Sequence, residues 1–345
     1  MNPDNTSILI VYTGGTIGML KDPADGIMKP FDLQKIMQAV PEIKGLGYHI
    51  EAVSFDPPVD SSDINTDTWS SMAEIIEKNY KKFDGFVILH GTDTMAYSAS
   101  ALSFMLENLS KPVIFTGAQL PIGALRTDGK ENLITSIVIA GAKEYGKPVV
   151  PEVSIFFESK LSRGNRTTKV HAEHFNAFHS PNYPYLASAG VHLVYHREYM
   201  RYPGKFRKLI VHKALNRNIA ILKLFPGLTP EIMDTILEYK PLKGLVLETY
   251  GAGNAPSAPW FLERIKKAVD RGVIILDVTQ CSTGSVEMGR YETSRHLLNA
   301  GVISGYDITT EAATAKLMVL LAQNMNNEEV KMHLNRSLKG EITVP

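Results

Sequence analysis

Short apolar runs rich in β-branched residues recur along this chain, separated by stretches with the spacing of amphipathic helices. Strands that are apolar throughout must be covered on both faces, and their alternation with helices is typical of a parallel sheet between two helical layers. The pattern therefore predicts an α/β fold with a mainly parallel, doubly wound sheet. In the first half we expect strands over Ile8–Tyr12, Ala52–Val59, Phe86–Leu89, Pro112–Thr116 and Val153–Phe157, and helices over Phe31–Val40, over Thr68–Phe83, from Met95 and near Glu131–Lys143.

The alternation pauses over Pro181–Arg217, which has little periodicity, and then resumes. A chain of 345 residues is long enough for two domains. We therefore expect a larger N-terminal α/β domain over 1–200, a linker over 201–217 and a smaller C-terminal α/β domain over 218–345. In the smaller domain we expect strands over Ile219–Leu224, Gly244–Tyr250 and Val273–Val278, and helices from Pro230, from Pro259 and near Glu311–Asn324.

Composition narrows the range of partners and compartments. Lys and Arg together number 36, as do Asp and Glu, so no overall field attracts nucleic acid or an anionic membrane. The single cysteine, Cys281, allows no intrachain disulfide. The first residues lack the basic start and apolar core of a signal peptide, and no apolar run is long enough to span a membrane. We expect a cytoplasmic protein that binds neither nucleic acid nor membranes.

Four of the expected strands are followed by glycines, hydroxyls and carboxylates. The segments that follow them are Thr13–Gly18, Asp60–Asp63, His90–Thr94 and Gly117–Gln119. Because ligands of doubly wound sheets bind beyond the carboxyl ends of the strands, these segments predict one polar pocket. Taken alone, Thr92 and Asp93 are better explained by helix capping, and only the rest of the chain favours a site.

Several common kinds of site do not fit these segments. Thr13–Gly18 lacks the Gly-Lys-Ser/Thr of a P-loop and departs from G-x-G-x-x-G, and Gly251–Pro256 is better explained as a turn. His171, His174 and His179 match no zinc spacing, so we expect structural or incidental roles for them. No G-x-S-x-G motif marks a serine hydrolase. A threonine nucleophile remains, and it needs activation.

Six segments, in order over nearly the whole chain, together resemble the bacterial type I L-asparaginases, the cytoplasmic branch of the asparaginase/glutaminase family. They are YTGGTIGM, DSSD, HGTDTMAYSASALSFMLENL, GNRTTK, YGAGNAP and TQC. The resemblance implies a larger N-terminal and a smaller C-terminal α/β domain, and homodimers or homotetramers. It also implies hydrolysis of L-asparagine to L-aspartate and ammonia without a cofactor or metal.

The resemblance also implies roles for individual residues. Thr16 is the implied nucleophile, and the implied second catalytic group is Thr92, Asp93 and Lys169. The residues implied to bind substrate are Asp60, Ser61, Ser62, Thr92, Asp93 and the backbone carbonyl of Ala118. These assignments suit a zwitterionic amide, because the two aspartates can accept from its ammonium group. Ser61 and the backbone N–H groups near Thr92 can hold its carboxylate.

Lys169 follows a segment, Ser162–Thr168, that in isolation has the composition of a solvated basic loop. A lysine beside a carboxylate keeps its proton at neutral pH, so we expect a Thr92–Lys169–Asp93 relay rather than a free-amine base. Backbone N–H groups of Gly14–Thr16 and the Thr92 hydroxyl are both candidate donors to the oxyanion. An acyl-Thr16 intermediate and direct attack by water both remain open.

The chain departs from the family pattern at two places. Ile27 aligns with a tyrosine of the mobile loop, although Pro23, Gly26 and Pro30 still suit a lid. Tyr12 and Tyr97 are candidates to supply the missing phenol, although neither is a convincing replacement. Glu248 stands where some type I enzymes carry an arginine of an allosteric asparagine site, while Thr168 and Cys281 remain. A carboxylate cannot pair with the carboxylate of asparagine, so we expect weak or absent cooperativity.

Three other functions compete with this interpretation. A glutaminase differs by one methylene of substrate, which is worth only about 1–3 kcal/mol of discrimination. An amidotransferase subunit acting on charged tRNA would carry an added N-terminal module, yet the first expected strand already begins at Ile8. The third, a non-catalytic amino-acid sensor, would not need Thr16, Thr92, Asp93 and Lys169 together.

Overall fold

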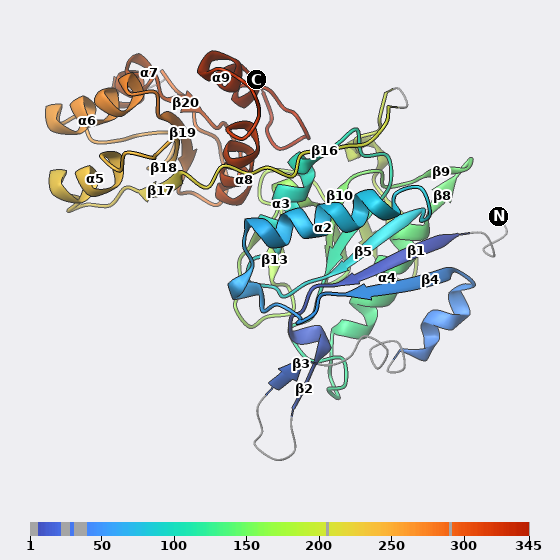
Figure 1. Cartoon of the computed structure of the whole chain (residues 1–345). Coiled ribbons are helices and arrows are strands. Elements are labelled where there is room, and N and C mark those ends of the chain that lie inside the picture. Colours follow the sequence, from blue (N-terminus) through green and yellow to red (C-terminus); the bar gives the residue numbers. More distant parts are fainter. Residues whose placement is uncertain (1–5, 22–27, 31–39, 205–206, 290–291, 345) are drawn as a thin grey trace. The chain divides into compact units, whose positions relative to one another are not determined.

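The computed structural model describes residues 6–21, 28–30, 40–204, 207–289 and 292–344. It divides into two compact units, Met1–Lys213 and Ala214–Pro345 (Figure 1). Ile27 and nearly all of the expected helix over Phe31–Val40 lie outside the described residues. In the part of the chain that is described, no helix has both the length and the apolar character needed to cross a bilayer.

The described part of the first unit contains an eight-stranded sheet in the order β15-β14-β11-β10-β7-β5-β1-β4. Its parallel strands are β4 (His49–Ser54), β1 (Ser7–Tyr12), β5 (Gly85–Leu89), β7 (Val113–Thr116) and β10 (Val153–Phe157). The antiparallel strands are β11 (Lys160–Arg163), β14 (Ala187–Ala189) and β15 (Leu193–Tyr195). The prediction of a mainly parallel α/β sheet is confirmed.

Both faces of the central strands β1, β5, β7 and β10 are buried, as apolar strands require. Ile8 and Val87 belong to a core cluster with Leu133 and Ile137 of helix α4 (Gly129–Gly141). Strand residues of alternate parity point to the opposite face and are also buried, among them Leu9. Helices α2 (Thr66–Asn79) and α3 (Met95–Met105) complete the layers, and Figure 1 shows α2 and α4 on opposite sides of the sheet.

The strand order reverses at β1. The chain passes from β1 to its neighbour β4 on one side and then crosses to β5 on the other side. Such a reversal opens a crevice beyond the carboxyl ends of the two central strands, where doubly wound proteins bind ligands. Thr13–Thr16 and His90–Thr94 follow those two strands, so the topology itself marks them as the place for a site.

Three expectations about this unit need correction. The strand expected over Ala52–Val59 is β4, which ends at Ser54, because Pro57 and Pro58 have no N–H to donate to a ladder. Helix α2 begins earlier than expected, since the Asn65 side chain accepts from the N–H groups of Asp67 and Thr68. The region expected to be irregular, Pro181–Arg217, contributes β14 and β15 to the sheet.

The second unit is a smaller α/β layer structure. Its described sheet has the order β17-β18-β19-β20, all parallel. The strands are β17 (Ile219–Lys223), β18 (Gly244–Thr249), β19 (Ile274–Thr279) and β20 (Ile303–Ser304). The helices are α5 (Pro230–Leu237), α6 (Pro259–Asp270), α7 (Glu292–Ala300), α8 (Thr310–Leu320) and α9 (Asn327–Leu334). Leu245 and Ile275 pack with Phe261 and Leu297 in its core.

The remaining elements of the first unit are short. The strands are β2 (Met19–Lys21), β3 (Met28–Pro30), β6 (Leu106–Glu107), β8 (Lys143–Glu144), β9 (Lys147–Pro148), β12 (Thr168–Lys169), β13 (Phe178–His179) and β16 (Ile210–Val211). Short 3₁₀ helices are η2 (Thr16–Gly18), η3 (Pro41–Leu46), η4 (Ser61–Asp63), η5 (Gly164–Arg166) and η6 (Arg197–Tyr199). Of these, η2, η4 and β12 carry residues of the candidate site.

Candidate active site

Glycines let three loops pack backbone against backbone at the reversal point of the sheet. A Cβ on Gly14 would overlap the backbone of Val59, and one on Gly15 would overlap the backbone of Gly91. A Cβ on Gly91 would in turn lie 2.5 Å from Oγ of Ser61. Gly14 and Gly15 also have φ values of 139° and 91°, which favour glycine. The residues that directly follow these contacts are Thr16, Thr92 and Asp60.

Hydrogen bonds fix the same three loops. The Thr13 N–H donates to Leu89 O at 2.9 Å, and the Val59 N–H donates to Thr13 O at 2.7 Å. The Thr94 hydroxyl donates to Ser61 O at 2.6 Å. Thr16 begins η2 and is half-buried. The segments after β1, β4 and β5 therefore converge, as the sequence predicts from the positions of the strand ends.

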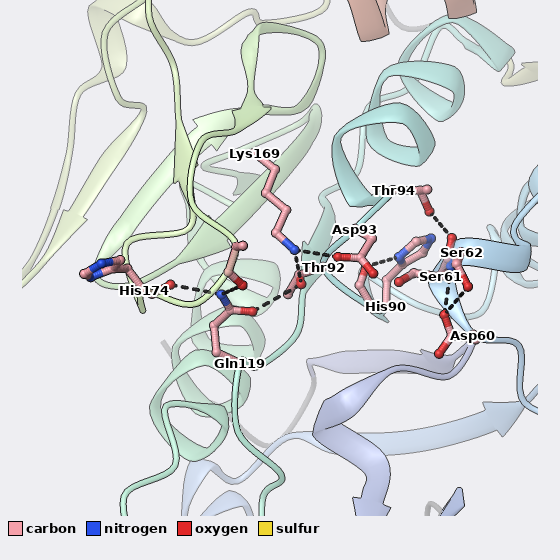
Figure 2. A network of polar contacts seen from close by, with 12 residues as sticks. Asp60, Ser61, Ser62, His90, Thr92, Asp93, Thr94, Gln119, Lys169 and His174 are labelled. Atoms are coloured by element: carbon pink, nitrogen blue, oxygen red, sulfur yellow. Dashed lines mark hydrogen bonds and ion pairs between the residues drawn. The ribbon is translucent and has the colours of Figure 1, made fainter. Parts of the chain in front are cut away.

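Lys169 reaches this place from a distant part of the chain. Its Nζ donates to Thr92 Oγ1 at 2.9 Å and to Asp93 Oδ1 at 2.6 Å (Figure 2). The Thr92 residue is 8% exposed and the Lys169 side chain 17%, whereas the Asp93 side chain is 63% exposed. The ammonium group is therefore held between a buried hydroxyl and a carboxylate that keeps contact with solvent.

The segment that leads to Lys169 is not the solvated loop that its composition suggests. Arg163 and Arg166 are buried, and the Arg163 Nε donates to Glu152 Oε2 at 2.6 Å. Both guanidinium groups lie against the ring of Tyr183, at 4.3 and 5.1 Å from its centroid. A buried, paired segment holds the backbone before Lys169 in place, and strand β12 brings the Lys169 side chain to Thr92 and Asp93.

The segment after β4 presents hydroxyls and a carboxylate. Asp60 precedes η4 and accepts from the N–H and the hydroxyl of Ser62, both at 2.8 Å. These two hydrogen bonds lower the pKa of Asp60, so the exposed carboxylate is ionised at neutral pH. Ser61 is buried against Gly91.

Ala118 and Gln119 follow β7. Ala118 is buried, and the Asn132 amide of α4 donates to the neighbouring Gly117 O at 3.0 Å. Gln119 Oε1 accepts from the Thr92 hydroxyl at 3.2 Å, and its Nε2 donates to the carbonyls of Ala172 and His174, each at 3.0 Å. In the sequence, Gln119 stands at a strand end, but no pattern there indicates a role for it. Only the side-chain geometry distinguishes it from its neighbours.

His90 is a second residue for which the sequence gives no function. Its Nδ1 lies 2.6 Å from Gly91 O, and its Nε2 lies 2.8 Å from the Ser98 hydroxyl. Because the carbonyl oxygen of Gly91 can only accept, the His90 proton is on Nδ1, and the unprotonated Nε2 accepts from the Ser98 hydroxyl. Ser98 in turn accepts from the Trp69 indole N–H at 2.9 Å. Complete burial lowers the pKa of His90 to about 4, so it is neutral beside Thr92 at physiological pH.

The other histidines do not form a metal centre in the part of the chain that is described. No group of three or more His, Cys, Asp or Glu side chains there could hold an ion. The rings of His171 and His174 are 5.0 Å apart, and Figure 2 shows the His174 ring directed away from Lys169. The described arrangement brings together hydroxyl oxygens, an ammonium group and carboxylates.

Glu248 and Cys281, which the resemblance relates to an allosteric site, lie in the second unit. Glu248 Oε1 accepts from the Thr310 hydroxyl at 2.7 Å, and Glu248 Oε2 lies 3.8 Å from Lys223 Nζ. Cys281 is exposed. Thr168 belongs to the first unit, in β12, and pairs with His179. The Glu248 carboxylate already has a hydrogen-bond donor and a nearby cation within its own unit.

Comparison with known proteins gives consistent matches over both units. The Asparaginase, N-terminal family matches residues 7–201, and the Glutaminase/Asparaginase C-terminal domain family matches residues 218–334. L-asparaginase 1 of Escherichia coli strain K12 is 43% identical over 340 residues, which cover 98% of each chain. The 60 kDa lysophospholipase of Mus musculus is 40% identical over 370 residues, covering 100% of this chain and 64% of that protein.

A solved structure is also similar. L-asparaginase I of Vibrio cholerae O1 biovar eltor str. N16961 has a TM-score of 0.89 and 42% identity. The match covers 98% of this chain and 99% of that one. The similarity therefore extends over both α/β units and is not confined to the segment around Thr92.

Proposed function

Since this chain belongs to the asparaginase family, we propose that it is an amidohydrolase that converts L-asparagine and water to L-aspartate and ammonia. One observation supports this most strongly. Lys169, Thr92 and Asp93 form one hydrogen-bonded group although 76 residues separate Lys169 from Asp93. The group lies beside Gly15, the residue before Thr16, because Gly91 packs directly on that glycine.

Substrate binding uses the charges at the edge of the pocket. The ionised Asp60 and the exposed Asp93 accept hydrogen bonds from the ammonium group of asparagine. Ser61 and backbone N–H groups before α3 hold the carboxylate, at the positive end of that helix. Fixing the zwitterionic end orients the side-chain amide, so part of the entropic cost of reaction is met on binding.

The reaction itself begins at Thr16. Its hydroxyl oxygen attacks the amide carbon and gives up its proton, and the oxyanion accepts from backbone N–H groups of the Gly14–Thr16 turn. The C–N bond then breaks as the amide nitrogen gains that proton and leaves as ammonia. Water then cleaves the acyl-threonine and releases aspartate. The ammonium of Lys169 stabilises negative charge on Thr92 Oγ1 while protons move through the Thr92–Lys169–Asp93 group. Direct attack by water, positioned by Thr92, is the alternative route.

Three single variants test these roles. Thr16→Ala, Thr92→Val and Lys169→Met should each lower kcat by about 10²–10⁴-fold, because each removes a nucleophile or a proton-handling group. Ammonia release measures the rate, and circular dichroism with thermal unfolding shows that each variant is folded. A folded variant with near-full activity would remove its residue from the mechanism.

Specificity is tested with parallel substrates. We expect ammonia release from L-asparagine to exceed that from L-glutamine, and fatty acid release from lysophosphatidylcholine to be absent. Equal rates on the two amides would instead assign a broader glutaminase-asparaginase. Fatty acid release alone would assign the activity that names the mouse relative.

We further propose a homodimer or homotetramer in the cytoplasm, with a catalytic domain over 1–200, a linker over 201–217 and a second domain over 218–345. The single exposed cysteine supports a reducing compartment. Light scattering of the purified protein measures the number of subunits, and proteolysis within 201–217 tests the linker.

A further inference from the structure

Gln119 and Thr92 are joined by a hydrogen bond whose direction is determined by the atoms around it. Gln119 Nε2 donates to two carbonyl oxygens, those of Ala172 and His174, each at 3.0 Å. Carbonyl oxygens can only accept, so the amide nitrogen of Gln119 must face them. The amide oxygen therefore faces Thr92 and can only accept a hydrogen from it.

Thr92 Oγ1 has one hydrogen and two lone pairs to arrange. The hydrogen goes to Gln119 Oε1 at 3.2 Å. One lone pair accepts from Lys169 Nζ at 2.9 Å. With the partners that the described residues provide, Thr92 Oγ1 keeps one lone pair that accepts no hydrogen bond.

We propose that Gln119 is a positioning residue that turns Thr92 into a hydrogen-bond acceptor for the group that enters the pocket. The inference rests on the proposed amidohydrolase function and deepens it. An attacking hydroxyl, whether of Thr16 or of water, has a hydrogen to donate and meets a lone pair on Thr92. Thr92 is then not a donor to the oxyanion, so that role falls to backbone N–H groups of the Gly14–Thr16 turn.

The backbone around Gln119 is built to hold this orientation. The Gln119 N–H donates to both oxygens of Asp128, at 3.1 and 3.0 Å, and the Leu120 N–H donates to Asp128 Oδ1 at 3.1 Å. Asn132 Nδ2 donates to Asp128 Oδ2 at 3.2 Å. The turn after β7 is thereby anchored to the start of α4, and the Gln119 side chain extends from a fixed point.

Two variants separate the effect of the amide oxygen of Gln119, which accepts from Thr92, from the effect of its two N–H groups. Gln119→Met removes the amide oxygen and both N–H groups with little change of size. Gln119→Glu keeps an oxygen acceptor for Thr92 and loses the donors to Ala172 and His174. We expect kcat for asparagine to fall about 10–100-fold in Gln119→Met with KM within about threefold, and to stay within about tenfold of wild type in Gln119→Glu.

Gln280 supplies a matched control in the second unit. Its Nε2 also donates to two carbonyls, those of Leu224 and Glu248, at 2.7 and 2.8 Å. Gln280→Met removes the same pair of donors without touching Thr92, so its kcat should equal that of wild type. Thermal unfolding of all three variants measures how much stability each substitution removes.

The inference is decided by which of the two Gln119 variants has the lower kcat. If Gln119 only anchored the loop of Ala172 and His174, Gln119→Glu would be as slow as Gln119→Met or slower, because its carboxylate repels both carbonyls. A kcat of Gln119→Glu equal to or below that of Gln119→Met overturns the proposal. A folded Gln119→Met with kcat within twofold of wild type also overturns it. Should Gln119→Met not fold, a tenfold or greater fall in kcat of folded Gln119→Glu overturns it. Wild-type protein that releases no ammonia from asparagine refutes the proposed function instead.

Discussion

At the scale of single residues, the spacing between the loops that carry Thr16 and Thr92 is set by Gly15. Its neighbour across the gap is the backbone of Gly91, and no flexible side chain lies between them that could move aside. A methyl group must therefore push the two loops apart. The φ of 91° at Gly15 adds conformational strain for any other residue.

Gly15→Ala should abolish measurable activity and lower the free energy of unfolding by about 2–4 kcal/mol, because overpacking and a left-handed backbone both cost energy. Gly45→Ala is the matched control. A Cβ on Gly45, in η3, meets nothing within 4 Å, so stability should change by no more than about 1 kcal/mol. Urea unfolding and ammonia release measure both effects. An active Gly15→Ala protein would contradict the close approach of the two loops.

Glu248 leads to a prediction about regulation. Its carboxylate accepts from Thr310 and lies near Lys223, and it would repel the carboxylate of a second asparagine. The initial rate should therefore depend hyperbolically on asparagine concentration, with a Hill coefficient near one. Cys281→Ser should leave that curve unchanged. A sigmoidal curve that becomes hyperbolic in Cys281→Ser would show that an allosteric site persists.

At the scale of elements, the sequence predicts best where a strand is buried on both faces. The runs Ile8–Tyr12, Phe86–Leu89 and Val153–Phe157 agree with β1, β5 and β10 to within one residue at either end. Burial makes such strands apolar along their whole length, which is the signal that the sequence carries. Strands β14 and β15 have only three residues each and pair antiparallel beyond the parallel set, so no apolar run marks them.

The candidate site likewise has residues whose positions the sequence predicts and contacts that it does not predict. The positions of Thr16 and Thr92 follow from strand ends, because the carboxyl ends of parallel strands share one edge of the sheet. The contact of Lys169 with Thr92 does not follow from any local pattern, since it depends on how Arg163 and Arg166 bury the preceding segment. The bond between Gln119 and Thr92 depends on a rotamer and on two distant carbonyls.

The C-terminal segment after α9 is attached to α8 by a buried ion pair. Lys316 Nζ lies 2.7 Å from Glu341 Oε1, and the two side chains are 1% and 0% exposed. Lys316 also donates to the carbonyls of Leu334 and Arg336 at 3.0 and 2.7 Å. The Glu341 carboxylate accepts the N–H groups of Leu338 and Lys339 at 2.9 and 2.7 Å. Desolvated charges in such a network are costly to leave unpaired.

Lys316→Met should therefore lower the free energy of unfolding by about 3–5 kcal/mol, because it leaves the Glu341 carboxylate buried without its cation. Lys331→Met is the control, since the Lys331–Glu328 pair is exposed and should contribute less than about 1 kcal/mol. Denaturant unfolding of the two variants measures the difference. Equal effects would mean that the buried pair does not stabilise the segment.

At the scale of the whole molecule, two buried groups give opposite dependences of stability on pH. His90 lies in the first unit, and burial lowers its pKa from 6.5 to about 4. Asp277 lies in the second unit, on β19, and burial raises its pKa from 3.8 to about 7. Among the described residues, Asp277 Oδ2 has no hydrogen-bond partner, while Thr249 donates to Oδ1 at 2.7 Å. Each group resists the charged form because it is desolvated.

The signs of the two effects follow from proton binding. Between pH 4 and 6.5 the unfolded chain binds more protons at His90 than the folded chain does, so this group contributes stability that is lost as the pH falls. Between about pH 4 and 7 the folded chain binds more protons at Asp277, so this group contributes stability that is lost as the pH rises. The two contributions oppose each other over most of that range.

Asp277→Asn isolates the second effect, because it keeps an oxygen for Thr249 and cannot ionise. The unfolding free energy of Asp277→Asn minus that of wild type should rise as the pH goes from 4 to 8, by on the order of 3 kcal/mol. Subtracting the two curves cancels the carboxylates that both proteins share. Urea unfolding at fixed ionic strength across this range measures the difference. A flat difference would show that Asp277 ionises at its ordinary pKa in the folded protein, and a falling one would reverse the sign of its contribution.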